Sequence, residues 1–265
     1  KLVTTIACLQ LRDRGLLSLD DPVSKHLASF QCSRPLDDGT DDSHTSTSTI
    51  TIRHCLNHTS GLSYYWMDPP HITSPTEKVW GHRMLSEDLN CGLDNGEVVD
   101  DFWSRCPSLF EPGEHYNYAG GHCVVAAIIE KLSGLSLPAY LETHIFGPLG
   151  MHDTTYLLTP EQRERLHPRC PLETAALPMS LFSRLFVPTF TDDAHDIHTQ
   201  PTHARGDSGL KGTANDWARL NLMLLNHGAL DGKRILSKES VLEISTSSVN
   251  GRLLEPPFAF QRGVT

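Results

Sequence analysis

The fold of this chain is decided by Tyr116-Asn-Tyr-Ala-Gly-Gly-His-Cys-Val-Val-Ala-Ala-Ile-Ile-Glu-Lys-Leu-Ser-Gly134. Apolar residues recur there with helical spacing, and five of them share one face: Val124, Val125, Ile128, Ile129 and Leu132. Gly134 can take the left-handed conformation that often ends a helix. The stretch therefore predicts a buried helix from just after Ala119 to Gly134, entered through a turn that holds Tyr116 and Tyr118.

A second helix is expected directly behind the first. Ser136 can cap it, and Tyr140, Leu141 and Ile145 supply its apolar side chains. We expect Gly147-Pro148 to break it, because proline lacks the backbone N–H that a helix interior needs.

The rest of the chain predicts short helices joined by loops. Helices are expected over 2–14, 23–27 and 50–58, with an exposed loop of Asp, Ser, Thr, Gly and His over 33–49. Thr213-Ala-Asn-Asp216 predicts the start of another helix, which ends near Gly228 and buries Trp217, Leu220 and Leu224. A turn at Asp231-Gly232 and a cap at Ser237 follow.

Composition excludes several classes of protein. The formal charge of −10 and pI near 5.8 argue against a nucleic-acid or anionic-membrane partner. The longest apolar run, Cys123 to Ile129, is far shorter than the ~20 residues that span a bilayer. The seven scattered cysteines never show Cys-x-x-Cys spacing and indicate buried thiols in a reducing compartment. We therefore expect a cytoplasmic protein, although the glycosylation sequon at Asn57 leaves secretion open.

Several motifs resemble one family of enzymes. Asn57-His-Thr-Ser-Gly-Leu62, Pro112-Gly-Glu-His-Tyr-Asn-Tyr-Ala-Gly120 and Phe146-Gly-Pro-Leu-Gly-Met151 are similar to segments of the serine β-lactamase and penicillin-binding-protein-like hydrolases, in the branch of class C β-lactamases, esterases and acyltransferases. The run from Lys1 through Leu-x-Leu-Asp-Asp-Pro-Val23 resembles the sequence that follows the family's Ser-x-x motif. The resemblance covers nearly the whole chain.

The resemblance implies an α+β fold, in which an antiparallel sheet flanked by helices meets a helix-rich domain at the active site. We expect 1–265 to be an incomplete β-lactamase-related domain, truncated at both ends and with much of the sheet missing. Residues 20–205 would form the mainly helical subdomain, and 1–19 and 206–265 would pack on the partial sheet. The family's serine would lie three residues before Lys1, and its Lys/His-x-Gly motif after Thr265.

The resemblance also implies the catalytic residues. Lys1 takes the place of the motif's lysine and Tyr118 that of the proton-carrying tyrosine. Gly120 stands where the family has a substrate-binding Asn, which puts β-lactam recognition in doubt and favours an esterase or acyl-transfer enzyme. Tyr64 and Trp66 are further candidates for the substrate cleft, with core packing an equally good account.

Other matches are weaker. Ser208-Gly-Leu-Lys211 is the only complete Ser-x-x-Lys, but a capped helix starts after it rather than at it, so Ser208 is expected in a loop. His58 and Ser60 are expected to shape a turn rather than react. His195 and His198, near three other polar residues, lack helical ligand spacing. The three polar residues near them are Asp192, Asp193 and His203, and the five together match no recognised metal-binding motif. We expect no metal and no cofactor.

The leading hypothesis is a serine hydrolase that acts on small-molecule esters or amides through an acyl-enzyme. The chain as written, without the nucleophile, is expected to be inactive. Two alternatives remain: a non-catalytic binding or regulatory protein that keeps the pocket, and an incomplete gene product.

Overall fold

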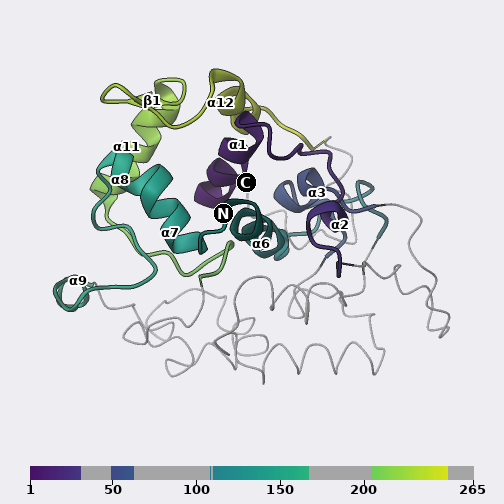
Figure 1. Cartoon of the computed structure of the whole chain (residues 1–265), viewed down its shortest axis with the longest axis horizontal. Helices are drawn as coiled ribbons and strands as arrows, with labels where there is room; N and C mark the ends of the chain where they lie inside the picture. The colour runs from purple at the N-terminus through teal and green to yellow at the C-terminus, as the bar shows by residue number, and fades with distance from the viewer. Residues whose placement is uncertain (31–48, 63–107, 109, 167–203, 250–265) are drawn as a thin grey trace, which may run out of the picture.

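The computed structural model describes residues 1–30, 49–62, 108, 110–166 and 204–249, and these form a mainly helical structure around one hydrophobic core (Figure 1). The only strands among them are β1 (Ala229–Leu230) and β2 (Lys233–Arg234), a short antiparallel hairpin. Its turn contains Asp231 and Gly232, as predicted, and both residues have positive φ. The helix-rich α+β class predicted from the sequence is confirmed.

Helix α6 (Gly121–Ser133) is the centre of this structure. Nine of its residues are buried, from Gly121 to Ile129, and it packs against α1, α2, α3 and α7. Gly134 ends it at φ 69°. The predicted helix, its apolar face and its terminal glycine are confirmed.

Helix α1 (Leu2–Asp13) lies across α6 and is buried on almost every side (Figure 1). Two buried polar residues fix its rotation. Thr4 Oγ1 donates a hydrogen bond to the Gly206 carbonyl at 2.6 Å, and Gln10 Nε2 donates to the carbonyls of His144 and Ile235 at 3.0 Å each. Because a buried polar group without a partner is costly, α1 has one favourable orientation about its axis.

The segment after α6 departs from the prediction at Gly147-Pro148. Helix α7 (Leu137–Leu141) continues into the π-helix η3 (Glu142–Phe146) and then into α8 (Gly147–Leu149) without a break. In the π turn, Gly147 N–H donates a hydrogen bond to the Glu142 carbonyl. Pro148 has no N–H to donate to the His144 carbonyl, and Gln10 Nε2 donates to that carbonyl instead. The helical segment ends one turn later, at Gly150 with φ 65°.

Helices α2 (Val23–His26) and α3 (Ile52–Leu56) flank α6. Thr51 caps α3 through a capping box with His54. A Cβ on Gly121 would lie 2.4 Å from the Cys55 carbonyl oxygen, so only glycine permits this close approach of α3 to α6. The predicted loop 33–49 lies almost entirely outside the described residues.

Helix α11 (Ala214–Leu225) begins as predicted, because Thr213 Oγ1 accepts a hydrogen bond from Asp216 N–H. Leu220 is fully buried and Leu224 packs against the core, but Trp217 is 40% exposed, so its predicted burial is wrong. The reason is Asp216, whose buried carboxylate accepts bonds from Asp153 N–H at 2.9 Å and Thr154 Oγ1 at 2.8 Å. These bonds turn the adjacent Trp217 toward solvent.

The remaining helices are α9 (Pro160–Glu164), capped by Thr159, and α12 (Lys238–Ser245), capped by Ser237 as predicted. Within the described ranges, no single helix is both long and apolar enough to cross a membrane. Helix α6 and the segment Leu137–Leu149 have the required length and apolar composition only when taken together, and they are bent by 74° relative to each other. Cys8, Cys55 and Cys123 are buried free thiols. The prediction of buried thiols is confirmed for these three.

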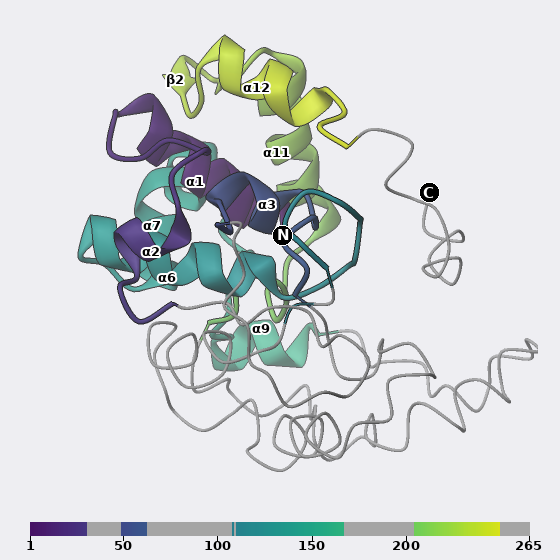
Figure 2. The ribbon, with the colours of Figure 1, turned by 90° about the vertical axis from the view of Figure 1, so that its right-hand side faces the viewer.

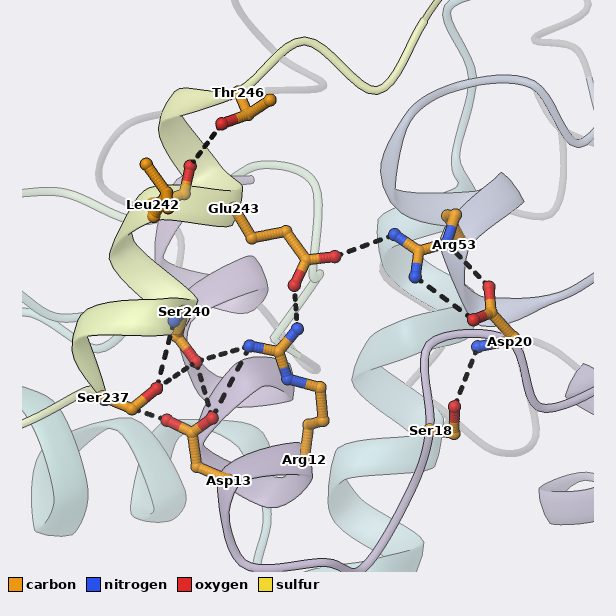
Figure 3. Close-up of polar contacts among 10 residues, drawn as sticks. All are labelled: Arg12, Asp13, Ser18, Asp20, Arg53, Ser237, Ser240, Leu242, Glu243 and Thr246. Carbon is orange, nitrogen blue, oxygen red and sulfur yellow. Dashed lines mark hydrogen bonds and ion pairs between the residues drawn. The ribbon is translucent and has the colours of Figure 1, made fainter.

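Charged side chains join three helices at one edge of the core (Figure 3). Glu243 on α12 accepts bonds from Arg12 on α1 and from Arg53 Nη1 on α3, the latter at 2.8 Å. Arg53 also pairs with Asp20, and Asp13 accepts from Ser240 Oγ at 2.6 Å. Figure 2 shows α12 lying across the end of α1. This network attaches the last described helix to the first.

We predict that Glu243→Gln destabilises the protein by about 1–2 kcal/mol at pH 7. This is less than the loss of a buried ion pair would cost, because the side chains of Arg12, Glu243 and Arg53 are 22% to 36% exposed. Burial raises the pKa of Glu243, but the bonds from Arg53 and Arg12 outweigh burial and hold it below its usual value. A depressed carboxyl pKa stabilises the fold above the unfolded-state value and loses that effect as pH falls.

Urea unfolding at pH 7 and pH 4 measures this effect, with Glu239→Gln as the matched control because Glu239 is an exposed residue on the same helix. The control is expected to change stability by less than about 0.5 kcal/mol. Equal losses in the two variants, or a Glu243→Gln effect that grows toward pH 4, would contradict the role assigned to the network.

Candidate functional site

Lys1 lies at the N-terminus of α1 and is half-buried. Its Nζ donates a hydrogen bond to the Asp207 carbonyl at 3.1 Å and lies 4.6 Å from the centroid of the Tyr118 ring. The structure thus brings together the two residues that the sequence nominated as catalytic, from positions far apart in the chain. The amine lies over the face of the aromatic ring, a cation–π contact that places the lysine and the tyrosine side by side.

The backbone around Tyr118 is held by the turn that precedes it in sequence. Asn117 N–H donates to the His58 carbonyl at 2.8 Å, and Asn117 Nδ2 donates to the Leu62 carbonyl at 2.8 Å. Ala119 N–H donates to His58 Nδ1 at 3.2 Å. The turn at 58–62 therefore fixes the position of Tyr118, in keeping with the structural role expected for this motif.

Two histidines form the wall behind the lysine and the tyrosine. The His58 ring lies 4.8 Å from Tyr118 and 5.2 Å from His122, between centroids, and 5.8 Å from Tyr116. Burial, with the charge of Lys1 adding to its effect, lowers the pKa of His58 to about 4. Burial also holds the pKa of His122 well below its usual value, with His58 and Lys1 adding to the effect. Both rings are neutral at pH 7.

The tautomer of His58 follows from its partner. Because Nδ1 accepts a hydrogen bond from Ala119 N–H, the ring proton sits on Nε2. His58 also adopts φ 62°, a conformation that histidine takes more readily than most residues. The imidazole is thus locked in one orientation and one protonation state.

The segment 204–208 closes the site between α1 and α6. Tyr156 Oη donates to the Arg205 carbonyl at 2.7 Å, and Thr4 and Lys1 bind the carbonyls of Gly206 and Asp207. A Cβ on Gly206 would lie 2.0 Å from the His122 carbonyl oxygen, so glycine allows this segment to touch α6. Arg205 and Asp207 form an ion pair, with Nε–Oδ1 at 2.9 Å.

The other predicted site residues have different outcomes. Gly120 is buried at the N-cap of α6, two residues after Tyr118. Tyr64 and Trp66 lie outside the described residues, as do the histidines and aspartates at 192–203. Among the residues that the structure does describe, no group of three or more His, Cys, Asp or Glu could hold a metal ion.

The two serines set aside from the sequence occupy places unlike that of a nucleophile. Ser208 is an exposed loop residue whose Oγ donates to Asp207 Oδ1 at 2.9 Å, and α11 begins only at Ala214. Ser60 is buried, and its Oγ accepts from Leu62 N–H at 3.4 Å. Both predictions, of a loop residue and of a turn residue, are confirmed.

Sequence reasoning missed His122, Arg205 and Asp207. A signal existed for His122, which follows Tyr118 by four residues and is the second residue of α6, the most apolar helix described. None existed for the ion pair: Arg205-Gly206-Asp207 matches a common tripeptide, and only the fold brings it to Lys1.

A sequence model of the Beta-lactamase family matches residues 1–263. The chain belongs to the Beta-lactamase family. The β-lactamase and penicillin-binding-protein-like resemblance noted in its motifs is therefore confirmed, and with it membership of a family of β-lactamase-fold serine hydrolases and acyltransferases.

The curated relatives include an acyltransferase and an esterase. The chain is 32% identical to monacolin J acid methylbutanoyltransferase of Aspergillus terreus over 165 residues, which is 60% of this chain and 36% of the relative. It is 28% identical to lovastatin esterase of Penicillium rubens over 235 residues, 87% of this chain and 54% of the relative. A third relative is a Mycobacterium tuberculosis protein, 26% identical over 99% of this chain and 62% of the relative. The chain therefore spans between 36% and 62% of the length of these three relatives.

Solved structures agree on the fold. Unliganded simvastatin synthase from Aspergillus terreus superposes with a TM-score of 0.66 at 23% identity, over 95% of this chain and 57% of that one. The β-lactamase/transpeptidase-like fold expected from the sequence is confirmed.

We predict that His58 makes stability depend on pH between 6.5 and 4. Its pKa is lower in the folded than in the unfolded protein, so the unfolded state binds more protons in this window and stability falls as pH decreases. His58→Asn keeps an acceptor near Nδ1 and tolerates positive φ. Between pH 6.5 and pH 5 the wild-type protein is expected to lose about 1.5 kcal/mol more stability than the His58→Asn variant.

Urea unfolding at the two pH values tests this, and His227→Asn is the control because His227 is exposed and also has positive φ, 54°. The control is expected to leave the pH dependence unchanged. An unaltered pH dependence in His58→Asn would show that His58 is not held neutral.

Proposed function

We propose that the protein is a serine hydrolase or acyltransferase that cleaves carboxylic esters through an acyl-enzyme, with Lys1 and Tyr118 as its proton carriers. The observation that carries the proposal is the 4.6 Å approach of Lys1 Nζ to the Tyr118 ring, with both side chains half-buried. Membership of the Beta-lactamase family supports it.

In the proposed reaction a serine hydroxyl attacks the ester carbonyl while Lys1 and Tyr118 together accept its proton. Backbone N–H groups stabilise the negative oxygen of the tetrahedral intermediate. The phenol of Tyr118 then returns the proton to the leaving alcohol. Attack by water or by a second alcohol, with the same pair as base, releases the acyl group as acid or as a new ester.

The nucleophile is proposed to be a serine three residues before Lys1 in the parent protein. A Ser-x-x-Lys pair places both side chains on one face of a helix, and Lys1 stands at the start of α1. Ser208 is a poor candidate, because its hydroxyl is engaged by Asp207 in a loop. The chain 1–265 by itself is therefore expected not to turn over esters.

The proposed substrates are small esters rather than β-lactams. Gly120 has no side chain to donate to the amide of a β-lactam, and the relatives include acyltransferases and esterases, beside a penicillin-binding protein of Bacillus subtilis. Gly120, Tyr64 and Trp66 remain proposed substrate contacts.

The first experiment is to sequence the native transcript upstream of the Lys1 codon and express the full protein. Labelling with a fluorophosphonate probe, followed by peptide mapping, is expected to modify the serine three residues before Lys1. Hydrolysis of p-nitrophenyl butanoate is expected, with no turnover of a chromogenic cephalosporin.

Tyr118→Phe is expected to lower kcat for the ester at least about 100-fold, since it removes a proton carrier. Tyr116→Phe is the matched control, a neighbouring half-buried phenol, and is expected to change kcat less than about 5-fold. A label on Ser208, no label at all, or equal effects of the two substitutions would overturn the proposal and favour a binding protein.

A further inference from the structure

One carboxylate lies in the segment that touches Lys1. Asp207 supplies the carbonyl that accepts from Lys1 Nζ at 3.1 Å, and its side chain is only 3% exposed. A buried carboxylate beside an amine normally forms an ion pair with it. Here the carboxylate is engaged elsewhere.

Arg205 engages it through two parallel bonds. Nε donates to Asp207 Oδ1 at 2.9 Å and Nη2 donates to Oδ2 at 3.1 Å, with the Arg205 side chain 17% exposed. Ser208 Oγ donates a third bond, to Oδ1, at 2.9 Å. Because two-pronged Arg–carboxylate pairs are strong and directional, both oxygens of Asp207 are committed to this side of the segment.

Three titratable groups near Lys1 are neutral at pH 7: His58, His122 and Cys123. Burial lowers the pKa of both histidines and raises the pKa of the Cys123 thiol to about 12, and Tyr118 presents its ring. The charged groups of the segment 204–208, which Lys1 touches, are the Asp207 carboxylate and the Arg205 guanidinium, and they pair with each other.

We propose that Arg205 is a positioning residue for Lys1: by holding the Asp207 carboxylate, it limits the contact of Lys1 with Asp207 to a neutral carbonyl. A free carboxylate would stabilise the ammonium form of Lys1 and hold its proton. With the carboxylate neutralised by Arg205, the amine can release its proton to serve as a base. This proposal rests on the proposed function for one point, the role of Lys1 in proton transfer.

The test measures the reactivity of the Lys1 ε-amine directly and needs no turnover. Wild-type full protein and variants are labelled with trace acetic anhydride over pH 7–10, and peptide mapping reports the modification of the Lys1 ε-amine. Arg205→Met keeps the side chain's apolar stem and removes its charge. It is expected to slow labelling of the ε-amine about 10-fold at pH 8, because a nearby carboxylate shifts titration by about one pH unit or more.

Three further variants decide whether charge is the cause. Asp207→Asn keeps the backbone carbonyl and is expected not to slow labelling. The double variant Arg205→Met/Asp207→Asn is expected to react as fast as Asp207→Asn alone, and Arg205→Lys to stay near wild type. Lys233, an exposed lysine on β2, is the internal control and is expected to label equally in all variants.

The proposal is overturned if Arg205→Met leaves labelling of Lys1 unchanged, or if the double variant stays as slow as Arg205→Met. The second result would mean that Arg205 acts only by shaping the segment. Ester hydrolysis by the full protein is measured separately. If Lys1 responds as expected but no ester is cleaved, the proposed function fails while the role of Arg205 stands.

Discussion

Close backbone contact on two sides of the head of α6 is the constraint on which the rest of the structure depends. Gly121 lets α3 approach through the Cys55 carbonyl, and Gly206 lets the segment 204–208 approach through the His122 carbonyl. A side chain at either glycine would separate these elements. The tyrosine turn, the histidine wall and the carbonyl that binds Lys1 all belong to the pieces that meet there.

The sequence predicted the elements well because their signals are local. Capping by Thr213 and Ser237, the apolar face of α6 and the terminal Gly134 each depend on residues a few positions apart. Predictions failed where a distant partner decided the outcome. Asp216 turned Trp217 outward through bonds to residues 153 and 154, and Gln10 allowed the helix to continue through Gly147-Pro148.

The candidate site was predictable only in part, for the same reason. The resemblance of motifs nominated Lys1 and Tyr118, and the structure places them in contact. The electrostatic surroundings could not be read from the sequence, because neutral histidines and a neutralised carboxylate are properties of burial and pairing. His122 is four residues from Tyr118, but nothing in its sequence neighbours fixes the extent to which it is buried.

The orientation of α1 links the charged edge of the fold to the site. The rotation of this helix is set at one end by Arg12 and Asp13, which bind α12, and along its length by Thr4 and Gln10. Since Lys1 starts the same helix, a rotation that broke those bonds would also move its amine away from the Asp207 carbonyl and the Tyr118 ring. Polar bonds along a buried helix cost desolvation, but in return they define one orientation, which an apolar helix of the same shape would not.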